Sequence, residues 1–156
     1  MSRSLGRELP TSLLALLDGQ NIPAKIGLAL LMTTVDARDY PHPALLSVGE
    51  VFSPSPTELR LALYSSSSTT KNLRRSGRFT LSLAHGGMGY YIKATARELP
   101  DALPGLAAFQ AAVDEVLEDG EPIAHVTSGF TIQLTGDGSR TVNAWEQTVA
   151  ALRTIS

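Results

Sequence analysis

The sequence predicts a mainly β fold, a six-stranded antiparallel barrel with flanking helices. Two observations lead to this prediction. Several short apolar segments alternate apolar with polar side chains, which is the period of a strand. Most of these segments follow one another through short turns, so neighbours in the chain can pair as antiparallel neighbours in the sheet. The 156 residues show no internal repeat and no domain linker, so we expect a single domain over residues 1–156.

The first elements are a short helix and a hairpin. Thr11 and Ser12 precede leucines at helical spacing, which predicts a capped helix that ends near Gly19. Residues 26–35 and 42–51 are apolar, and the turn residues DARDYP lie between them. We therefore expect two paired strands in this part of the chain.

The middle of the chain predicts three strands and a helix. The prolines and serines of residues 53–56 break the chain, and residues 58–64 then alternate leucines with polar residues as a third strand. Residues 69–77 fit one short helix, and residues 78–84 alternate again as a fourth strand. The HGGMG turn leads into a fifth strand at residues 90–98, which we expect to pair with the fourth.

The last part of the chain predicts two helices and one strand. Phe109, Val113 and Val116 are spaced by four and three residues, so residues 104–119 are expected to form an amphipathic helix. Residues 128–134 are expected to form the sixth strand. After a GDGS turn, the segment VNAWEQTVAALR predicts a closing helix.

The net charge of −2 conceals an uneven distribution along the chain. Residues 59–97 contain seven Lys or Arg and no acid, whereas residues 98–139 contain eight acids and no Lys or Arg. This split would allow a local anion site, but charge alone favours the alternative of two solvated faces. The basic stretch 71–78 also raises nucleic-acid binding, but the overall acidity argues against it, and we expect no nucleic-acid partner.

The sequence excludes several classes of site. It contains no cysteine, so disulfides and thiolate metal sites are absent, and His42, His85 and His125 show no metal-ligand spacing. HGGMG lacks the third glycine of a dinucleotide fingerprint, and no GxSxG or HExxH motif occurs. The N-terminal residues lack the long apolar stretch of a signal peptide or membrane span. We therefore expect a cytoplasmic protein with no metal and no membrane partner.

Residues 64–78 read YSSSSTTKNLRRSGR, six hydroxyl side chains followed by four cations. One interpretation is a serine-rich linker, and the other is a phosphate site. Because the stretch joins a strand end to a helix start, Ser67, Ser68 and Thr69 would lie where helix N–H groups have no backbone partner. This position favours the phosphate site. The four cations lie on more than one helical face, so only one or two of them could reach a single anion.

With its flanking segments, this stretch resembles the pyridoxamine 5'-phosphate oxidase-like family of FMN-binding split barrels. The resemblance covers about residues 27–98, through LLMTTVD, YPHPALLSV, LRLALYSSSSTTKNLRRSGRFTLSL and YYIKATARE. It implies a six-stranded antiparallel split β-barrel of the Greek-key type, which forms a homodimer with FMN between the subunits. It also implies an FMN-dependent oxidoreductase that acts on an unidentified small molecule. The alternative is a non-catalytic protein that binds or senses a flavin, a deazaflavin or heme.

The resemblance also implies which residues bind the cofactor. The strand that lies along the isoalloxazine ring in relatives corresponds to Pro43, Ala44, Leu45, Leu46 and Ser47. These residues could instead be barrel core. The loop and helix that hold the phosphate correspond to Ser65, Ser67, Ser68, Thr69, Lys71 and Asn72. Relatives often carry a Ser-Arg-Lys triplet there. It falls on Ser67, Ser68 and Thr69, so hydroxyls replace both cations, and Lys71 is expected to restore the missing charge.

The sequence identifies no catalytic residue. His42, Tyr90 and Tyr91 are candidate proton donors, and each of them has a structural role as its alternative. The oxidase proper has a C-terminal segment rich in Arg and His that recognises its substrate, but only two arginines lie near this C-terminus. We therefore do not expect pyridoxamine phosphate oxidation. Trp145 is expected to anchor the last helix by packing, in preference to stacking on a flavin.

Overall fold

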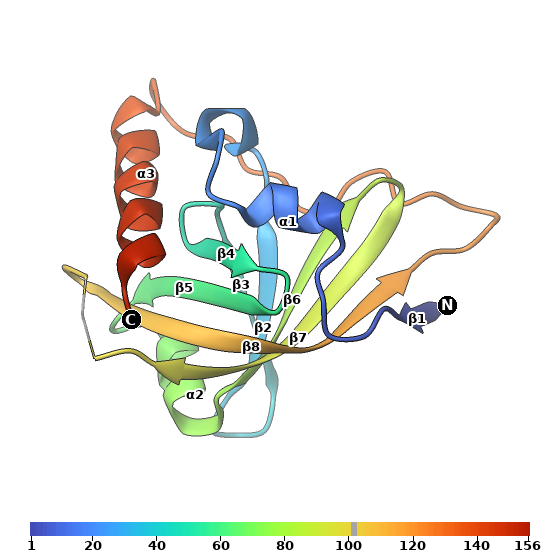
Figure 1. Ribbon diagram of the computed structural model, residues 1–156, viewed down its shortest axis with the longest axis horizontal. Coiled ribbons are helices and arrows are strands. Elements are labelled where there is room, and N and C mark those ends of the chain that lie inside the picture. The colour runs from blue at the N-terminus through green and yellow to red at the C-terminus, as the bar shows by residue number, and fades with distance from the viewer. Residues whose placement is uncertain (101–102) are drawn as a thin grey trace.

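The computed structural model describes residues 1–100 and 103–156, and it contains one antiparallel sheet of eight strands with helices on both sides (Figure 1). The strands are β1 (Ser2–Ser4), β2 (Leu30–Val35), β3 (Pro41–Leu46), β4 (Val51–Ser55), β5 (Glu58–Tyr64), β6 (Arg78–His85), β7 (Met88–Glu98) and β8 (Leu106–Asp119). The helices are α1 (Thr11–Leu17), the 3-10 helix η1 (Ile22–Lys25), α2 (Ser68–Ser76) and α3 (Ser139–Thr154). The mainly β prediction is confirmed.

The strands follow the order β3-β2-β6-β7-β8-β5-β4, and β1 pairs with β8. Within the described residues, β3 and β4 end this path and do not pair with each other, so the path is open. The prediction of six strands is wrong, because the sheet has eight. The prediction missed β1 and β4, took β8 for a helix, and placed a strand at residues 128–134 that does not form.

The hairpins and helices predicted in the first two thirds of the chain are confirmed. β2 pairs with β3, and β6 pairs with β7 across the glycines of HGGMG. The alternation in β5 buries Leu59, Leu61 and Leu63 in the main core, where they meet apolar residues of β6, β7 and β8. α1 and α2 begin and end within a residue or two of the predicted bounds. Gly77 ends α2 at φ 72°, a left-handed conformation that glycine adopts without a steric penalty.

The break predicted at residues 53–56 falls mostly within a strand, β4, and the chain turns instead at residues 47–50 and 56–57. The segment predicted as one strand over residues 42–51 ends as β3 at Leu46, and the turn of residues 47–50 leads into β4. β4 contains Pro54, which is exposed. An edge strand tolerates proline where its missing N–H would face solvent. The chain therefore reverses at residues 56–57, between β4 and β5.

The helix predicted over residues 104–119 is wrong, because residues 106–119 form β8 at the centre of the sheet. β8 pairs with β7 along one edge, and with β5 and then β1 along the other. One edge of the strand pairs with β7, which directly precedes it, and the other edge pairs with β5 and β1, which lie far away in sequence. This tertiary pairing overrides the helix propensity of the alanine- and glutamate-rich segment.

A β-bulge explains why the sequence of β8 looks helical. Lys93 of β7 pairs with Glu115, but the next residue of β7 pairs with Val113, so Asp114 is an extra residue in β8. From Ala107 to Val113 every second residue of the strand packs into the main core, and the bulge then moves the next residue of that core to Val116. Together these steps give the spacing of four and three that is typical of a helix face.

Residues 128–134 do not form the sixth strand. Their β-type pairing is limited to one isolated bridge, between Leu28 and Thr131. Beside it, the Ile132 N–H donates to the Gly27 carbonyl at 3.0 Å. β2, which follows Leu28, already has β3 on one edge and β6 on the other. The segment therefore finds no free strand edge there, and most of its residues are exposed.

Candidate functional site

The hydroxyl-rich loop first serves to cap α2. Ser67 is the N-cap, and its Oγ accepts the Thr70 N–H at 3.1 Å. The Ser67 hydroxyl also donates to Thr70 Oγ1 at 3.1 Å, and the Thr70 hydroxyl donates to the Tyr64 carbonyl at 2.8 Å. The hydroxyls of Ser67 and Thr70 therefore hold the start of the helix in place.

The other predicted phosphate-site residues divide into exposed and buried side chains. Ser65, Ser68 and Lys71 are exposed at the start of α2, whereas Thr69 is 5% exposed. The Ser65 hydroxyl donates to the Gly105 carbonyl at 3.2 Å. The structure thus presents the Ser68 hydroxyl and the Lys71 ammonium group to solvent on the first turn of the helix.

Two of the four cations in the stretch are held by other groups. Arg74 forms two hydrogen bonds with Glu98, from Nε at 2.8 Å and from Nη2 at 2.7 Å. Arg75 donates to the Val35 carbonyl. Across β7 and β8, Lys93 forms an ion pair with Glu115 at 3.2 Å. The uneven charge distribution of the sequence is therefore partly explained by pairing between the basic segment and the acidic one.

A buried polar chain connects α2 to the strand predicted to bind the ring. Asn72 Nδ2 donates to Thr34 Oγ1 at 3.0 Å, and the Thr34 hydroxyl donates to the His42 carbonyl at 3.5 Å. Asn72 and Thr34 are both buried, at 4% and 1% exposure. β3 and the start of α2, which the sequence predicted as two halves of one site, are thus joined through β2. Sequence reasoning did not identify Thr34.

The residues of β3 alternate between the core and the surface. Leu46 and the following Ser47 are buried, Ala44 is half-buried, and Pro43 and Leu45 are exposed. The alternative that these residues are simply core therefore fails for Pro43 and for Leu45, which is 49% exposed. β3 is also an end strand, so its second backbone edge faces away from the sheet.

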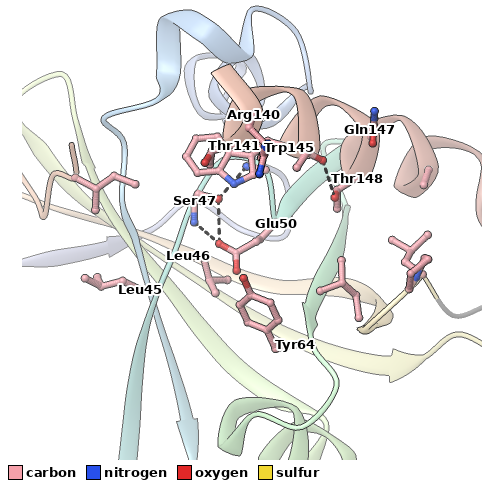
Figure 2. Close-up of a pocket in the computed structure, with 17 residues that line it drawn as sticks. Leu45, Leu46, Ser47, Glu50, Tyr64, Arg140, Thr141, Trp145, Gln147 and Thr148 are labelled. Carbon is pink, nitrogen blue, oxygen red and sulfur yellow. Dashed lines mark hydrogen bonds between the residues drawn. The ribbon is translucent and has the colours of Figure 1, made fainter. Parts of the chain in front are cut away.

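A cavity of about 870 Å³ opens beside the end of β3 and continues beneath α3. Figure 2 shows Leu45, Leu46 and Ser47 on one side and the residues of α3, including Trp145, on the other. Tyr64, the last residue of β5, also lines this α3 cavity. Because Tyr64 directly precedes the hydroxyl-rich loop, the cavity extends from the predicted ring strand to the start of the predicted phosphate loop.

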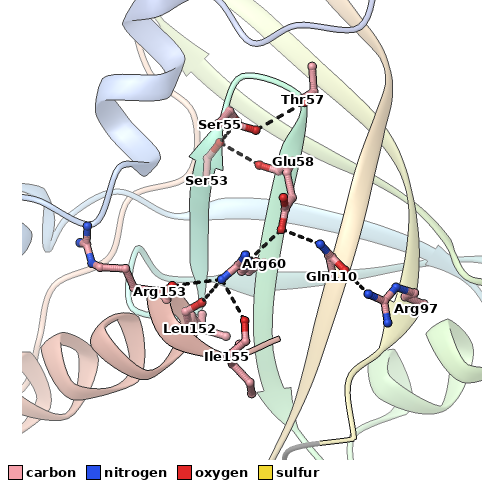
Figure 3. Close-up of polar contacts among 10 residues, drawn as sticks. All are labelled: Ser53, Ser55, Thr57, Glu58, Arg60, Arg97, Gln110, Leu152, Arg153 and Ile155. Carbon is pink, nitrogen blue, oxygen red and sulfur yellow. Dashed lines mark hydrogen bonds and ion pairs between the residues drawn. The ribbon is translucent and has the colours of Figure 1, made fainter.

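The wall that α3 forms is fixed to the sheet by Arg60 (Figure 3). Arg60 Nη1 donates to the carbonyls of Leu152, Arg153 and Ile155, at 2.8, 3.2 and 3.1 Å. These groups belong to the last turn of a helix, where carbonyls lack partners within the helix. Arg60 Nε also pairs with Glu58 at 2.8 Å. Arg60 thus positions the C-terminal end of α3.

Trp145 packs α3 against the turn between β3 and β4. A Cβ built on Gly49 would lie 2.1 Å from Trp145 Cγ, so the indole occupies the space that any other residue at this position would need. Trp145 also contacts the apolar cluster of Val149 and Leu152. The predicted packing role is observed, and the same indole lines the α3 cavity.

Among the described residues that line the cavity, Glu50 is the one with an acidic side chain. Its Oε2 accepts the Ser47 N–H at 2.6 Å and the Ser47 hydroxyl at 3.0 Å. Burial raises the pKa of the Glu50 carboxyl above its ordinary value, and the two bonds from Ser47 oppose that shift. Sequence reasoning missed Glu50, because a single acid between two strands matches no motif.

The raised pKa of Glu50 predicts how stability depends on pH. The folded state holds the proton to higher pH than the unfolded state does, so this group's contribution to stability is full below the ordinary pKa and falls as pH rises through the folded pKa. Glu50→Gln keeps the shape but cannot ionise. In urea titrations across this pH range, the wild type should lose stability relative to Glu50→Gln as pH rises. A constant difference between the two proteins would contradict the prediction.

The three predicted proton donors, His42, Tyr90 and Tyr91, do not line the α3 cavity. The Tyr90 hydroxyl donates to Glu118 at 2.9 Å and the Tyr91 hydroxyl donates to Asp119 at 2.7 Å. Burial raises the pKa of Tyr90, and the bond to Asp119 raises that of Tyr91. Neither tyrosine lines the α3 cavity, and nor does His42 on β3. The contacts of both tyrosines fit the structural alternative.

Two kinds of feature are absent from residues 1–100 and 103–156. In this part of the chain, no helix is both long enough and apolar enough to cross a membrane. No group of three or more His, Cys, Asp or Glu side chains in the same residues is arranged to hold a metal ion.

Comparisons with known proteins show similarity to a protein sequence and to several solved structures. No protein-family model matches the chain. YclD of Bacillus subtilis, an uncharacterized protein, is 32% identical over 144 residues, which cover 90% of this chain and 93% of YclD. A Lactobacillus delbrueckii protein provisionally assigned as a pyridoxamine 5'-phosphate oxidase is similar with a TM-score of 0.57 and 18% identity, over 73% of this chain and 98% of that one. An FMN-binding protein from Syntrophomonas wolfei gives a TM-score of 0.54 and 14% identity, over 70% of this chain and 88% of that one.

Proposed function

We propose that this chain, which belongs to the same family as YclD and has the fold of pyridoxamine 5'-phosphate oxidase-like proteins, binds a flavin-type cofactor. The resemblance seen in the sequence is confirmed at the level of the fold. One structural relative is named for binding FMN, and FMN is the cofactor that we propose here. The observation that carries the proposal is the buried chain Asn72–Thr34–His42, which holds β3 and the start of α2 together as the two parts of one site.

The edge of β3 fits the polar rim of an isoalloxazine ring. Pro41 and Pro43 lack an N–H, so we infer that their backbone groups face away from β2, as prolines do in edge strands. Leu45, two residues further on, then directs its N–H and carbonyl to the same free edge. The exposed Leu45 side chain would cover part of the ring face, and Ala44, Leu46 and Ser47 would support the strand from the sheet side.

The first turn of α2 fits the phosphate. The Ser68 hydroxyl, the N–H groups of Ser68 and Thr69 and the exposed Lys71 ammonium group would bind it, and Asn72 would hold the helix against β2. Ser67 caps the helix, so its contribution is to orient these groups. Ser65 would support the loop through its bond to the Gly105 carbonyl.

A second copy of the chain completes the proposed arrangement. Leu45 and Tyr64 are exposed apolar side chains, 49% and 69% exposed, at the side of the α3 cavity. We propose that a homodimer covers this side and encloses the cofactor, and that the curved sheet acts as a split barrel. Size-exclusion chromatography with light scattering would test the dimer, and a monomer at micromolar concentration would count against it.

A bound flavin supplies hydride or electron transfer, and the chain supplies its position and the exclusion of water. We propose an oxidoreductase acting on a small molecule. A purified protein that absorbs as an oxidised flavin, with FMN found by mass spectrometry after denaturation, would support the cofactor. Bleaching of that absorbance by NADH or NADPH would favour the enzyme over a flavin-binding protein without turnover.

Ser68→Glu is expected to weaken FMN binding about tenfold or more, because it places a negative charge at a helix N-terminus proposed to bind a phosphate. Thr69 is buried, so a glutamate there would disturb folding and would not test the site. Ser128→Glu is the matched control, because Ser128 is exposed in the loop between β8 and α3 and belongs to neither part of the proposed site. Fluorescence titration of apoprotein with FMN measures both affinities. Equal affinities for FMN in the two variants would place the phosphate elsewhere.

A further inference from the structure

The α3 cavity extends beyond the space that the proposed cofactor site requires. It shares Leu45, Leu46 and Ser47 with the strand that would hold the ring, but it continues beneath α3, away from α2. Its remaining walls are largely apolar, with Trp145, Leu106 and Ile132 among them. A molecule in this part of the cavity would lie beside the ring and would not compete with the phosphate.

Glu50 gives this largely apolar space a carboxyl group that is held in a defined orientation. Its Oε2 is occupied by the N–H and the hydroxyl of Ser47, whereas Oε1 has no hydrogen-bond partner among the described residues. In the described residues, every fully buried side-chain oxygen or nitrogen has a hydrogen-bond partner. Because Oε1 has none, it is not fully buried, and we infer that it is reached from the cavity that Glu50 lines. A carboxylate oxygen accepts hydrogen bonds, so the group that meets it must be a donor.

The other charged side chain in the cavity wall, Arg140, does not cancel the preference of Glu50 for a hydrogen-bond donor. Arg140 lies on the first turn of α3 and is exposed, so water screens its charge. Glu50 is only partly accessible, and Ser47, which orients it, is 6% exposed. A hydrogen bond to Glu50 would therefore form in a mostly apolar surrounding, where it discriminates strongly between ligands with and without a donor.

We propose that the α3 cavity is the substrate pocket, and that it takes a largely apolar molecule with an N–H or O–H group that donates to Glu50. This inference rests on the proposed function, since it places the substrate beside the proposed flavin. Trp145 and the leucines contact the apolar part of this molecule, and Glu50 sets its orientation. Glu50 is thus a specificity-determining residue.

Indole and 1-methylindole test this proposal, because they differ mainly in one N–H donor. Isothermal titration calorimetry on the full-length protein as purified should show that indole binds at least about tenfold more tightly than 1-methylindole. Glu50→Leu should remove that preference and leave 1-methylindole binding near the wild-type level, which also shows that the cavity is intact. If Glu50→Leu does not fold, Glu50→Gln should still reduce the preference several-fold, because a neutral amide replaces the charged acceptor.

Glu146→Leu is the matched control, since Glu146 neighbours Trp145 on α3 but does not line the cavity. It should keep the full preference for indole. Equal binding of the two probes to the wild type, no binding of either, or the same loss in Glu146→Leu would overturn the proposal. Visible absorbance of each sample reports its flavin separately. A protein with flavin and no preference refutes only the substrate pocket, whereas a preference in protein that never binds flavin supports the pocket and refutes the cofactor.

Discussion

Replacing Arg60 by alanine is expected to lower the free energy of unfolding by about 3 kcal/mol. Arg60 donates to three carbonyls at the end of α3 and pairs with Glu58, and its side chain is 17% exposed. The variant leaves these carbonyls and one carboxylate oxygen without their main donor in a partly buried site. Thermal unfolding should shift down by about 10 °C for a protein of this size.

Arg153→Ala is the control for this experiment. Arg153 lies in the same last turn of α3, but its guanidinium is exposed and contacts the Phe52 ring at 4.9 Å from the centroid. Its removal should lower stability by less than about 1 kcal/mol. If urea titrations give the same change for both variants, Arg60 does not hold α3.

The Arg60 variant should also change the response to acid. Burial acts to raise the pKa of Glu58, but hydrogen bonds from Arg60 and Gln110 outweigh it and leave the pKa below its ordinary value. The stabilisation from Glu58 is therefore present above its ordinary pKa and is lost as pH falls through the folded pKa. Without Arg60 this loss on acidification should be smaller, which measurements of stability against pH can detect.

The sequence predicts those parts of the fold whose contacts are local. Two hairpins, β2–β3 and β6–β7, and the caps of α2 depend on residues that are close together in the chain. Local sequence patterns therefore predict them. β8 depends on β5, β7 and β1, and its bulge at Asp114 disguises the strand period as a helical one. No local pattern distinguishes these two cases, because the partner strands decide between them.

The candidate site shows the same division. The position of the hydroxyl-rich loop at a helix start follows from neighbouring residues, so Ser67 and Ser68 lie where the sequence predicts. Glu50 and Thr34 gain their importance only from packing. Glu50 faces a cavity that α3, far along the chain, helps to form, and Thr34 of β2 contacts Asn72 of the helix α2. Their surroundings form only when the chain folds.

Gly49→Ala is expected to destabilise the protein by about 3 kcal/mol and to move α3. The new Cβ would lie 2.1 Å from Trp145 Cγ and 2.5 Å from Trp145 Cβ, closer than carbon atoms can approach, so the indole must leave its place. Trp145 is the single tryptophan of the chain, so its emission reports this contact directly. We expect a red shift as the indole moves toward water, together with a lower midpoint in urea.

A double-mutant cycle separates this steric conflict from other effects of the new methyl group. Trp145→Leu removes the clashing ring, so Gly49→Ala should be far less destabilising in that background, with a coupling energy of about 2 kcal/mol. Gly27→Ala is the control, because a Cβ there would meet the Ile132 carbonyl oxygen at an ordinary 3.6 Å. If Gly49→Ala were as stable as Gly27→Ala with unchanged emission, Trp145 would not pack on Gly49, and the wall of the α3 cavity would lie elsewhere.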